Sequence, residues 1–540
     1  MRFICTYILL ISLLISTVAF TDSQPVSMEN ITVEDWVDPW RQSWAYEALD
    51  RLSSRGFISG FFHAKPIPAR ELEIYISEAL ESIEGGMKPD AQDSYYLARL
   101  IDHYMPDWYE VPDSIKEHRR SGRPSNMAFR EESNEFLYFR SGAQFLPIGD
   151  KWKTDVSRKN ASIETMLEGS IDITSRATIA GRWKIRQYFG DRWMPRYTSS
   201  DYVLRKRVWR TVAPAEKGYI NMELNIFHVL VGRDELSWGP GYRSNMLFSS
   251  SAPTYDVFKA NALWKGVRME FFTALLNPTT STYVSGHRLD LGFWKWLDIS
   301  VAEVVYYTGK GPCLYYINPL LPYYFVQWAE GDPDNILLEL GGEVRIIPNT
   351  RIYTALMIDD YYKEQWKKLL KSPHKVGMIL GVQYANPLGL SSSNLRVEYS
   401  RVNPGTYMHF SSEHYYLYRG IVPGYYQESD SDNIFLEFSK MLYPGILAFS
   451  GFNYERKGEF SAYVDDLPEA WNDYAKGMKF PSGDIVQRGY TLSFGFNAEP
   501  LFWRFDTAFR FDLLRYSNVK NQEGNDIEGC RASLLFRFTL

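Results

Sequence analysis

The sequence predicts an antiparallel all-β transmembrane barrel of about 16 to 18 strands, with a small N-terminal α-helical domain. Three observations lead to this fold class: a secretory start, hydrophobic alternation with a period of two from residue 134 onward, and an aromatic content of 16%. The aromatic residues comprise 38 Tyr, 32 Phe and 16 Trp. Outer-membrane barrels show this alternation and carry aromatic girdles at both membrane interfaces.

Residues 1–19 have the pattern of a signal peptide. Arg2 is followed by an apolar run from Tyr7 to Ile15, and small residues stand at Thr17 and Ala19. We expect cleavage after Ala19 and export from the cytoplasm. No later run approaches the roughly 18 to 20 apolar residues that a membrane-spanning helix needs. The expected location is therefore the outer membrane of a Gram-negative bacterium.

Residues 20–112 are predicted to form a helical domain in the periplasm. A first amphipathic helix should end at Gly56, a second should run from about 69 to 83, and a third from about 90 to 104. Residues 113–133, rich in Arg, Glu, Ser and Pro, are predicted to be a linker.

Residues 134–540 are predicted to form the barrel. The segment Tyr219–Val231 places apolar side chains on one face and polar ones on the other, and is expected to be one strand. The final strand, ending in Phe538 and Leu540, alternates in the same way. Short connections, such as Pro348-Asn349 and Pro444-Gly445, alternate with long ones, as periplasmic turns and external loops do. Seven short and eight long connections predict 16 strands.

Composition and motifs argue against several other functions. The net charge of −6 comes without a long block of one sign, so nucleic acid is not an expected partner. The eight His residues lack metal-ligand spacing, and the Ser-x-x-Lys spacing of Ser372 and Lys375 has no partner motif. We therefore expect no enzyme activity, no metal and no cofactor. Whether Cys313 and Cys530 pair is open.

The stretch from Asp234 to Trp264, between two predicted strands, is too rich in Gly and Pro for a helix or a ladder. Its segment SWGPGYRSNMLFSSSAP resembles the motif of the Wzi family of capsule-assembly outer-membrane proteins. Further matches follow in order: GHRLDL at Gly286–Leu291, YYINPLLPYY at Tyr315–Tyr324, DPDN at Asp332–Asn335 and MIDDYY at Met357–Tyr362.

The resemblance implies an 18-stranded barrel that is plugged on its periplasmic side. It also implies a surface that acts as a lectin for capsular polysaccharide, with outer-membrane lipid and capsule-export components as further partners. A split within residues 285–308, or a strand at 407–418, would raise the strand count above 16, although either alone upsets the alternation of short and long loops.

Trp238, Arg243 and Asn245 are candidate polysaccharide-binding residues. An indole face can stack on a sugar, and the planar guanidinium suits a uronic acid carboxylate. The alternative is that Trp238 wedges into the barrel lumen, with the Gly239-Pro240-Gly241 turn folding the loop back.

A second candidate binding group consists of Tyr315, Tyr316, Tyr323 and Trp328. The alternative for these aromatic residues is an interfacial girdle. The neighbouring acids Asp332 and Asp334 could hold calcium, or form a plain turn. Polar residues expected to shape the loops or the lumen are Asp332, Asn335, His287, Arg288, Asp359 and Asp360.

The sequence thus favours a non-enzymatic barrel that binds surface polysaccharide. A porin-like channel for sugars or small solutes is the alternative, and an outer-membrane hydrolase is a weaker third. These hypotheses differ in the lumen, because a plugged barrel conducts no ions.

Overall fold

The computed structural model describes residues 30–31, 44–60, 62–105, 112, 115 and most of 127–539. Within the last range the exceptions are 131–135, 153–156, 175–176, 191–210, 213–214, 225–226, 265, 310, 331–333, 361–373, 464–470, 472–474 and 503–504. The predicted signal peptide and most of the predicted linker lie outside the described residues, and the division into domains stays a prediction.

Three helices form near the N-terminus, close to the predicted positions: α2 (Trp44–Arg55), α3 (Ala69–Glu84) and α4 (Ala91–Tyr104). Helix α4 begins with a capping box, in which the Asp90 carboxylate accepts from the backbone of Asp93 while the Asp93 carboxylate accepts from the backbone of Asp90. The helices share an apolar core. Two short strands, β1 (Asn30–Ile31) and β3 (Ile67–Pro68), pair beside them.

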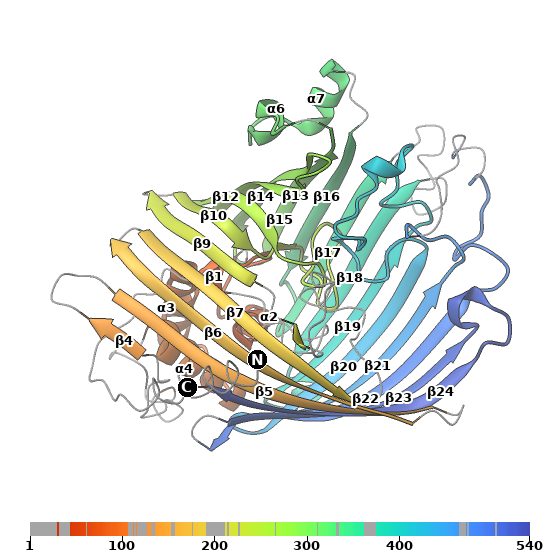
Figure 1. Cartoon of the computed structure of the whole chain (residues 1–540). Coiled ribbons are helices and arrows are strands. Elements are labelled where there is room, and N and C mark those ends of the chain that lie inside the picture. Colours follow the sequence, from red (N-terminus) through yellow and green to blue (C-terminus); the bar gives the residue numbers. More distant parts are fainter. Residues whose placement is uncertain are drawn as a thin grey trace.

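Most of the other strands close into an antiparallel barrel (Figure 1). Its wall consists of β5 (Phe136–Trp152), β6 (Ser157–Thr174), β7 (Ala177–Gly190), β9 (Ala215–Leu224), β10 (Phe227–Asp234), β12 (Tyr255–Trp264), β13 (Val267–Asn277), β14 (Thr282–Trp294), β15 (Leu297–Tyr307), β16 (Asn335–Val344), β17 (Thr350–Asp360), β18 (Lys375–Ala385), β19 (Ser393–Val402), β20 (Ser431–Tyr443), β21 (Ile446–Lys457), β22 (Gln487–Phe502), β23 (Phe505–Ser517) and β24 (Ile527–Thr539).

The ring closes where β24 pairs with β5 and where β7 pairs with β9, so the described chain forms 18 wall strands. Two short strands pair at the side, β4 (Met127–Arg130) on β5 and β8 (Thr211–Val212) on β7. Strand β4 lies within the segment predicted as linker. The count of 16 is too low, and the predicted upper value of 18 is correct.

The missing strands are explained by two-residue turns. The predicted single strand Tyr219–Val231 is a hairpin of β9 and β10, in which Leu224 pairs with Phe227. Because the turn spans two residues, the outward face passes from even to odd positions: Leu224 and Phe227 are exposed, whereas Leu230 is buried in the lumen. The expected split within 285–308 occurs between β14 and β15, whereas 407–418 forms no strand.

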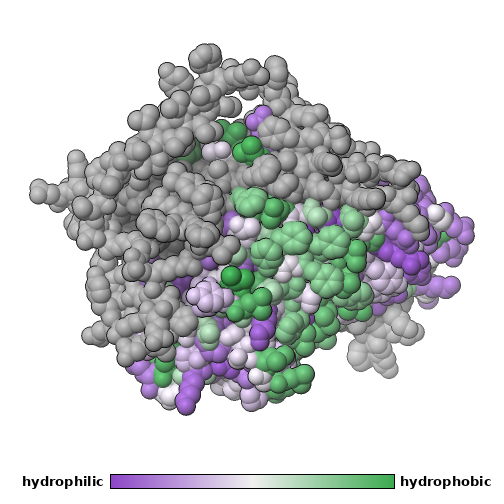
Figure 2. Space-filling view, turned by 90° about the horizontal axis from the view of Figure 1, so that it is seen from below, coloured by the Kyte–Doolittle hydropathy of each residue, from purple (hydrophilic) through white to green (hydrophobic). Residues whose placement is uncertain are grey.

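The outer face of the barrel wall is apolar, and the side chains that point into the lumen are buried. Along β15, Ile299 and Val301 are exposed, and Ser300 and Ala302 between them are buried. From below, hydrophobic side chains of the described residues gather in one area bordered by hydrophilic ones (Figure 2). Exposed aromatic residues mark the end with the short turns: Trp264, Trp294, Trp296 and Tyr443. Such a girdle marks a membrane interface.

The two ends of the lumen are filled by different parts of the chain. Helices α2, α3 and α4 lie at the end with the short turns, where their apolar core includes Met441 of β20. From the opposite end, the loops between β10 and β12, between β19 and β20, and between β21 and β22 share a second core. No described helix is long and apolar enough to cross a membrane.

Candidate functional site

The loop between β10 and β12 folds into the lumen. Its strand β11 (Ser237–Trp238) pairs with β2 (Ala64–Lys65) of the helical region. Trp238 is 0% exposed, and its Nε1 donates to Glu270 Oε1 over 2.8 Å. Its ring packs edge-on against Phe248 and Phe272. Trp238 therefore wedges into the lumen, and the prediction that it stacks on a sugar is corrected by this burial.

The Gly239-Pro240-Gly241 turn and Asn245 hold this loop in shape. Gly239 N donates to His63 O over 3.0 Å. At the φ of +130° of Gly239, a Cβ would lie 2.6 Å from Asn245 Oδ1. Asn245 Oδ1 accepts from Gly241 N (2.8 Å), and Asn245 Nδ2 donates to Ser237 Oγ (3.1 Å). The amide of Asn245 therefore serves the loop itself, which argues against the predicted contact with sugar.

Arg243 is held in the same way by the barrel interior. Its backbone N donates to Glu398 Oε1 over 3.0 Å, beside the bond from Tyr242 N to Glu398 Oε2 of 2.7 Å. The guanidinium carbon lies 5.0 Å from the ring centroid of Phe435 and 5.4 Å from that of Tyr426. The half-buried guanidinium thus packs between aromatic residues of this chain instead of facing an external surface, contrary to the prediction.

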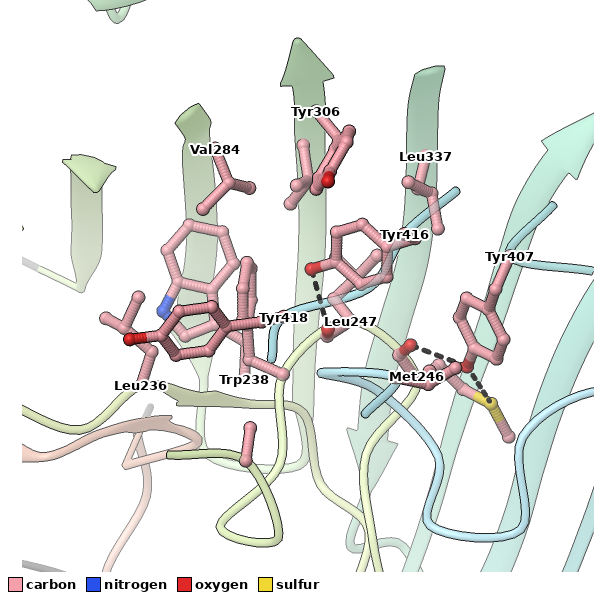
Figure 3. Packing of buried hydrophobic residues seen from close by; sticks show 14 of the residues in the cluster. Leu236, Trp238, Met246, Leu247, Val284, Tyr306, Leu337, Tyr407, Tyr416 and Tyr418 are labelled. Atoms are coloured by element: carbon pink, nitrogen blue, oxygen red, sulfur yellow. Dashed lines mark hydrogen bonds between the residues drawn. The ribbon is translucent and has the colours of Figure 1, made fainter. Parts of the chain in front are cut away.

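The loop between β19 and β20 closes over the first loop through tyrosine hydroxyls. Tyr407 donates to Met246 O over 2.8 Å, and Tyr416 donates to Leu247 O over 2.9 Å (Figure 3). Tyr418 donates to Thr254 O over 3.0 Å. These hydroxyls satisfy backbone carbonyls inside an aromatic core. The two loops therefore pack together as one unit in the lumen, which we call the lumen seal.

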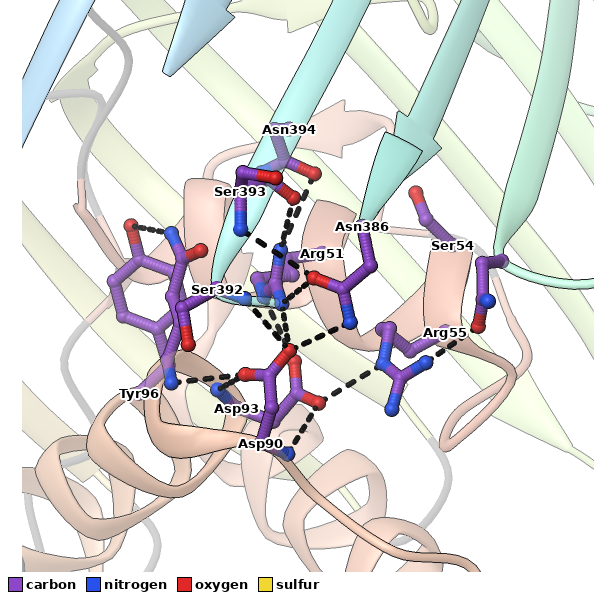
Figure 4. Close-up of polar contacts among 12 residues, drawn as sticks. Arg51, Ser54, Arg55, Asp90, Asp93, Tyr96, Asn386, Ser392, Ser393 and Asn394 are labelled. Atoms are coloured by element: carbon purple, nitrogen blue, oxygen red, sulfur yellow. Dashed lines mark hydrogen bonds and ion pairs between the residues drawn. The ribbon is translucent and has the colours of Figure 1, made fainter. Parts of the chain in front are cut away.

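At the periplasmic end, Arg51 of α2 ties the helices to the turn between β18 and β19 (Figure 4). Its guanidinium pairs with Asp90 (2.6 Å) and Asp93 (2.7 Å), and donates to Ser393 O (2.9 Å) and Asn386 Oδ1 (3.1 Å). Its side chain is fully buried. A buried charge is stable only when all of its partners are in place. This polar network therefore joins the barrel turn to the helical region of α2, α3 and α4, which we call the plug.

Polar side chains of the lumen wall also form ion pairs with the plug. His63 Nε2 lies 2.8 Å from Glu343 Oε2, and Arg351 pairs with both Asp50 (2.8 Å) and Glu343 (3.2 Å). Burial, and next the positive charge of Arg351, lower the pKa of His63 well below its usual range. The ring of His63 is therefore neutral in the docked plug.

His287 and Arg288 lie on opposite faces of β14. Arg288 faces the lumen, where it pairs with Asp290 (2.8 Å) and Glu339 (3.4 Å), as predicted. His287 faces outward and pairs with Glu303 of β15 over 3.1 Å, so its predicted place in the lumen is wrong. Successive strand residues point to opposite faces, so both could not line the lumen.

The predicted aromatic group lies on the helices α6 (Leu314–Ile317) and α7 (Tyr323–Glu330). Tyr316 and Tyr323 are buried, and Tyr315 packs partly buried against them. Trp328 is 72% exposed. Tyr316 and Tyr323 therefore offer no free ring face to a ligand, whereas Trp328 does.

An external cluster brings together three other predicted residues. The Asp360 carboxylate accepts from Lys375 Nζ over 2.5 Å, and Lys375 Nζ also donates to Met408 O over 2.9 Å. Asp359 Oδ2 accepts from Tyr407 N over 2.6 Å. Asn335 Nδ2 donates to His414 O over 3.1 Å, close to the short helix η4 (Ser412–His414). The strand ends of β16, β17 and β18 thus meet the β19–β20 loop here.

Phe410 is the exposed member of this cluster, which we call the rim cluster: Asn335, Asp359, Asp360, Lys375, His409, Phe410 and His414. The Phe410 ring is 64% exposed, with Lys375 Nζ 5.8 Å from its centroid. The ring of His409 lies 5.1 Å from that of Phe410. Burial, followed by the charge of Lys375, lowers the pKa of His409 to about 4, so its ring is neutral at physiological pH. Sequence patterns missed Phe410, because it lies in a loop without regular spacing.

The possible calcium site is only partly described. Asp332 lies outside the described residues. Asp334 is buried, and its Oδ2 accepts from Tyr316 OH over 3.0 Å. Within the described part of the chain, no group of three His, Cys, Asp or Glu side chains could hold a metal ion, and Cys313 and Cys530 are both free thiols.

Comparisons with known proteins agree with this architecture. The family model of the capsule assembly protein Wzi matches residues 147–479. The solved structure of Wzi, described as a carbohydrate-binding β-barrel of the outer membrane involved in group 1 capsule assembly in Escherichia coli, matches with a TM-score of 0.59 and 12% identity, over 92% of this chain and 97% of that one. OpdQ of Pseudomonas aeruginosa follows with a TM-score of 0.44 and 9% identity, over 75% of this chain and 98% of that one.

The search of curated protein sequences found no significant match. The family match covers more than half of the chain, and the similarity to the solved Wzi structure shows the same barrel fold. The protein is thus an outer-membrane β-barrel of a Gram-negative bacterium and belongs to the family of the capsule assembly protein Wzi.

Proposed function

We propose that this protein is a non-enzymatic lectin of the outer membrane, which binds capsular or related surface polysaccharide and assists its assembly at the cell surface. Family membership supports a role in capsule assembly. The filled lumen supports binding at the surface over transport, because the plug helices and the folded loops occupy both ends of the barrel.

The single observation that carries the location of the site is the exposed ring of Phe410 beside Asp360 and Lys375. The Asp360 side chain is about one third exposed, at 34%, and Lys375 is buried beneath it. Carbohydrate sites combine an apolar face with a few fixed polar groups. Phe410 supplies the face, and Asp360, oriented by Lys375, supplies acceptor oxygens for sugar hydroxyls.

The rim cluster is also positioned rigidly. Lys375 and Asp360 stand on adjacent, paired strands, and the backbone of Tyr407 is fixed by Asp359. A surface held by strand ends loses little conformational entropy when it binds a flexible chain, so less of the contact energy is spent on ordering. Capsule-export components remain proposed partners without an assigned surface.

A glycan array on the detergent-solubilised protein tests this proposal. The wild-type protein should retain bacterial polysaccharides, Phe410→Ala should lose at least about tenfold in apparent affinity, equivalent to about 1.4 kcal/mol, and Leu388→Ala, in the exposed turn between β18 and β19, should bind as wild type does. No retention by the wild-type protein contradicts the lectin function. Retention unchanged in Phe410→Ala contradicts the rim cluster as its site. Cleavage of a retained glycan contradicts the non-enzymatic role.

A further inference from the structure

The helices α6 and α7 pack on the outside of the barrel wall, not over its mouth. Their buried side chains, Tyr316, Tyr323 and Val326, form a separate core with Val305, Tyr307 and Ile336. The neighbouring residues Tyr306 and Leu337 belong to the lumen core. Because strand residues alternate between faces, Val305, Tyr307 and Ile336 point outward, and α6 and α7 cover them.

This packing shields polar groups that would otherwise face lipid. His287 and Glu303 pair on the outward face, and Tyr323 N at the start of α7 donates to Glu303 Oε2 over 2.8 Å. Ser285 and Tyr307 also point outward, with their hydroxyl oxygens 3.3 Å apart. Unsatisfied polar groups in hydrocarbon cost several kcal/mol each. The helices thus replace lipid at the external ends of β14 and β15.

Immediately below this covered region, the same wall is exposed and apolar. Leu289 of β14, Ile299 and Val301 of β15 and Leu340 of β16 are outward-facing and uncovered. Val301 and the covered Val305 are four residues apart, about 13 Å along a strand. The helices α6 and α7 therefore stand at the upper border of the lipid-facing band.

The side of the helices that faces away from the wall is itself apolar. Large exposed side chains gather there: Leu314 (82%), Leu320 (77%), Leu321 (40%), Phe325 (61%) and Trp328 (72%). Phe325 and Trp328 are three residues apart on α7, which places them on one helical face. Between Gly311 and Ala329 the sequence has no Asp, Glu, Lys or Arg. In Figure 1 both helices project above the upper ends of β13 to β16.

We propose that α6 and α7 form a membrane anchor that inserts into the outer leaflet, with Leu320, Leu321, Phe325 and Trp328 among its acyl chains. Continuity with the lipid-facing wall selects lipid as the occupant. The uncharged composition suits the boundary between acyl chains and headgroups, where Trp and Tyr accumulate. The anchor would hold this side of the barrel at a fixed depth, opposite the periplasmic girdle of Trp264, Trp294 and Trp296.

The depth of residue 328 in a bilayer tests the anchor. Trp328→Cys is made in a Cys313→Ser, Cys530→Ser background, spin-labelled and reconstituted into phospholipid liposomes. Collisions with oxygen, which concentrates in hydrocarbon, are compared with collisions with a water-soluble nickel chelate. Two matched controls are Val301→Cys on the lipid-facing wall and Ser412→Cys on the exposed external loop.

The label at residue 328 should resemble that at 301, with oxygen collisions exceeding nickel collisions, and the label at 412 should show the reverse. A water-like ratio at 328 overturns the proposal. Spin–spin broadening at 328 that persists when labelled protein is diluted with unlabelled lipid also overturns it, because a second copy of the chain then covers the patch. Since Trp328 is 72% exposed, its replacement leaves folding intact.

Discussion

Trp238 Nε1 donates a 2.8 Å hydrogen bond to Glu270 Oε1 inside the barrel. This bond fixes the loop after β10 against the wall strand β13, in contact with the plug. The same Glu270 pairs with Arg268 over 3.1 Å, so the indole completes a buried polar group. The loop that the sequence singles out by its motif is thus the centre of the lumen seal.

Replacing Trp238 should therefore destabilise the barrel rather than weaken sugar binding directly. Trp238→Ala removes a fully buried ring and leaves one Glu270 oxygen without its indole donor. We expect a loss of about 3 to 5 kcal/mol in the free energy of unfolding, measured by denaturant titration in lipid. Leu388→Ala, at a 92% exposed position in the turn between β18 and β19, should change it by no more than about 0.5 kcal/mol. Equal effects of the two substitutions would contradict the assignment.

The buried network around Arg51 should hold the plug in the barrel. Arg51→Met leaves Asp93 and Asp90 without their main counter-charge, and removing one partner of a buried pair costs about 3 to 5 kcal/mol. Hydrogen exchange in the amides of α2 and α4 should accelerate, while the wall strands keep their protection. Glu84→Gln, at an exposed helix end, is the control. Unchanged exchange in the Arg51 variant would show that other contacts hold the plug.

Docking of the plug should weaken in acid because of His63. Its pKa is depressed in the folded state, whereas the unfolded chain takes up a proton below about pH 6.5. The stabilising contribution is therefore complete above that pH and is lost as the pH falls, by at most about 1.4 kcal/mol per pH unit. His63→Gln should lose this slope between about pH 6.5 and pH 5. Parallel stability curves for both proteins would contradict this prediction.

The filled lumen predicts that the purified protein conducts no steady ion current in planar bilayers. The seal between Tyr407, Tyr416 and the first loop closes the external side, and the Arg51 network closes the other. A general porin in the same bilayers serves as the positive control. A stable open current from the wild-type protein would favour the alternative of a solute channel.

The barrel itself could be predicted from sequence, because its alternation and loop lengths follow directly from a wall with lipid on one side. The strand count failed where a two-residue turn let the alternation run on, as between Leu224 and Phe227. The predicted binding role of Trp238 and Arg243 failed for another reason. A motif shows that residues matter together, but only the inward fold of the loop shows which surface they face.

The site was harder to predict than the fold. Asp359 and Asp360 were selected through the family motif, but Phe410 lies about fifty residues further along the chain and meets them only through the β19–β20 loop. His287 was expected in the lumen. Because side chains alternate along β14, it lies instead on the outer face of the barrel wall, beneath α7. Such contacts depend on long loops whose course leaves no periodic pattern in the sequence.

Retention of polysaccharide on living cells tests the central claim most directly. Encapsulated cells that lack their own protein of this family are complemented with the wild-type chain, Phe410→Ala or Leu388→Ala, and the polysaccharide on cells and in the medium is measured. The lectin account predicts retention with the wild-type chain and with Leu388→Ala, and release into the medium with Phe410→Ala at equal barrel levels. Equal retention with all three chains would contradict the rim cluster, and release with all three would contradict the lectin function.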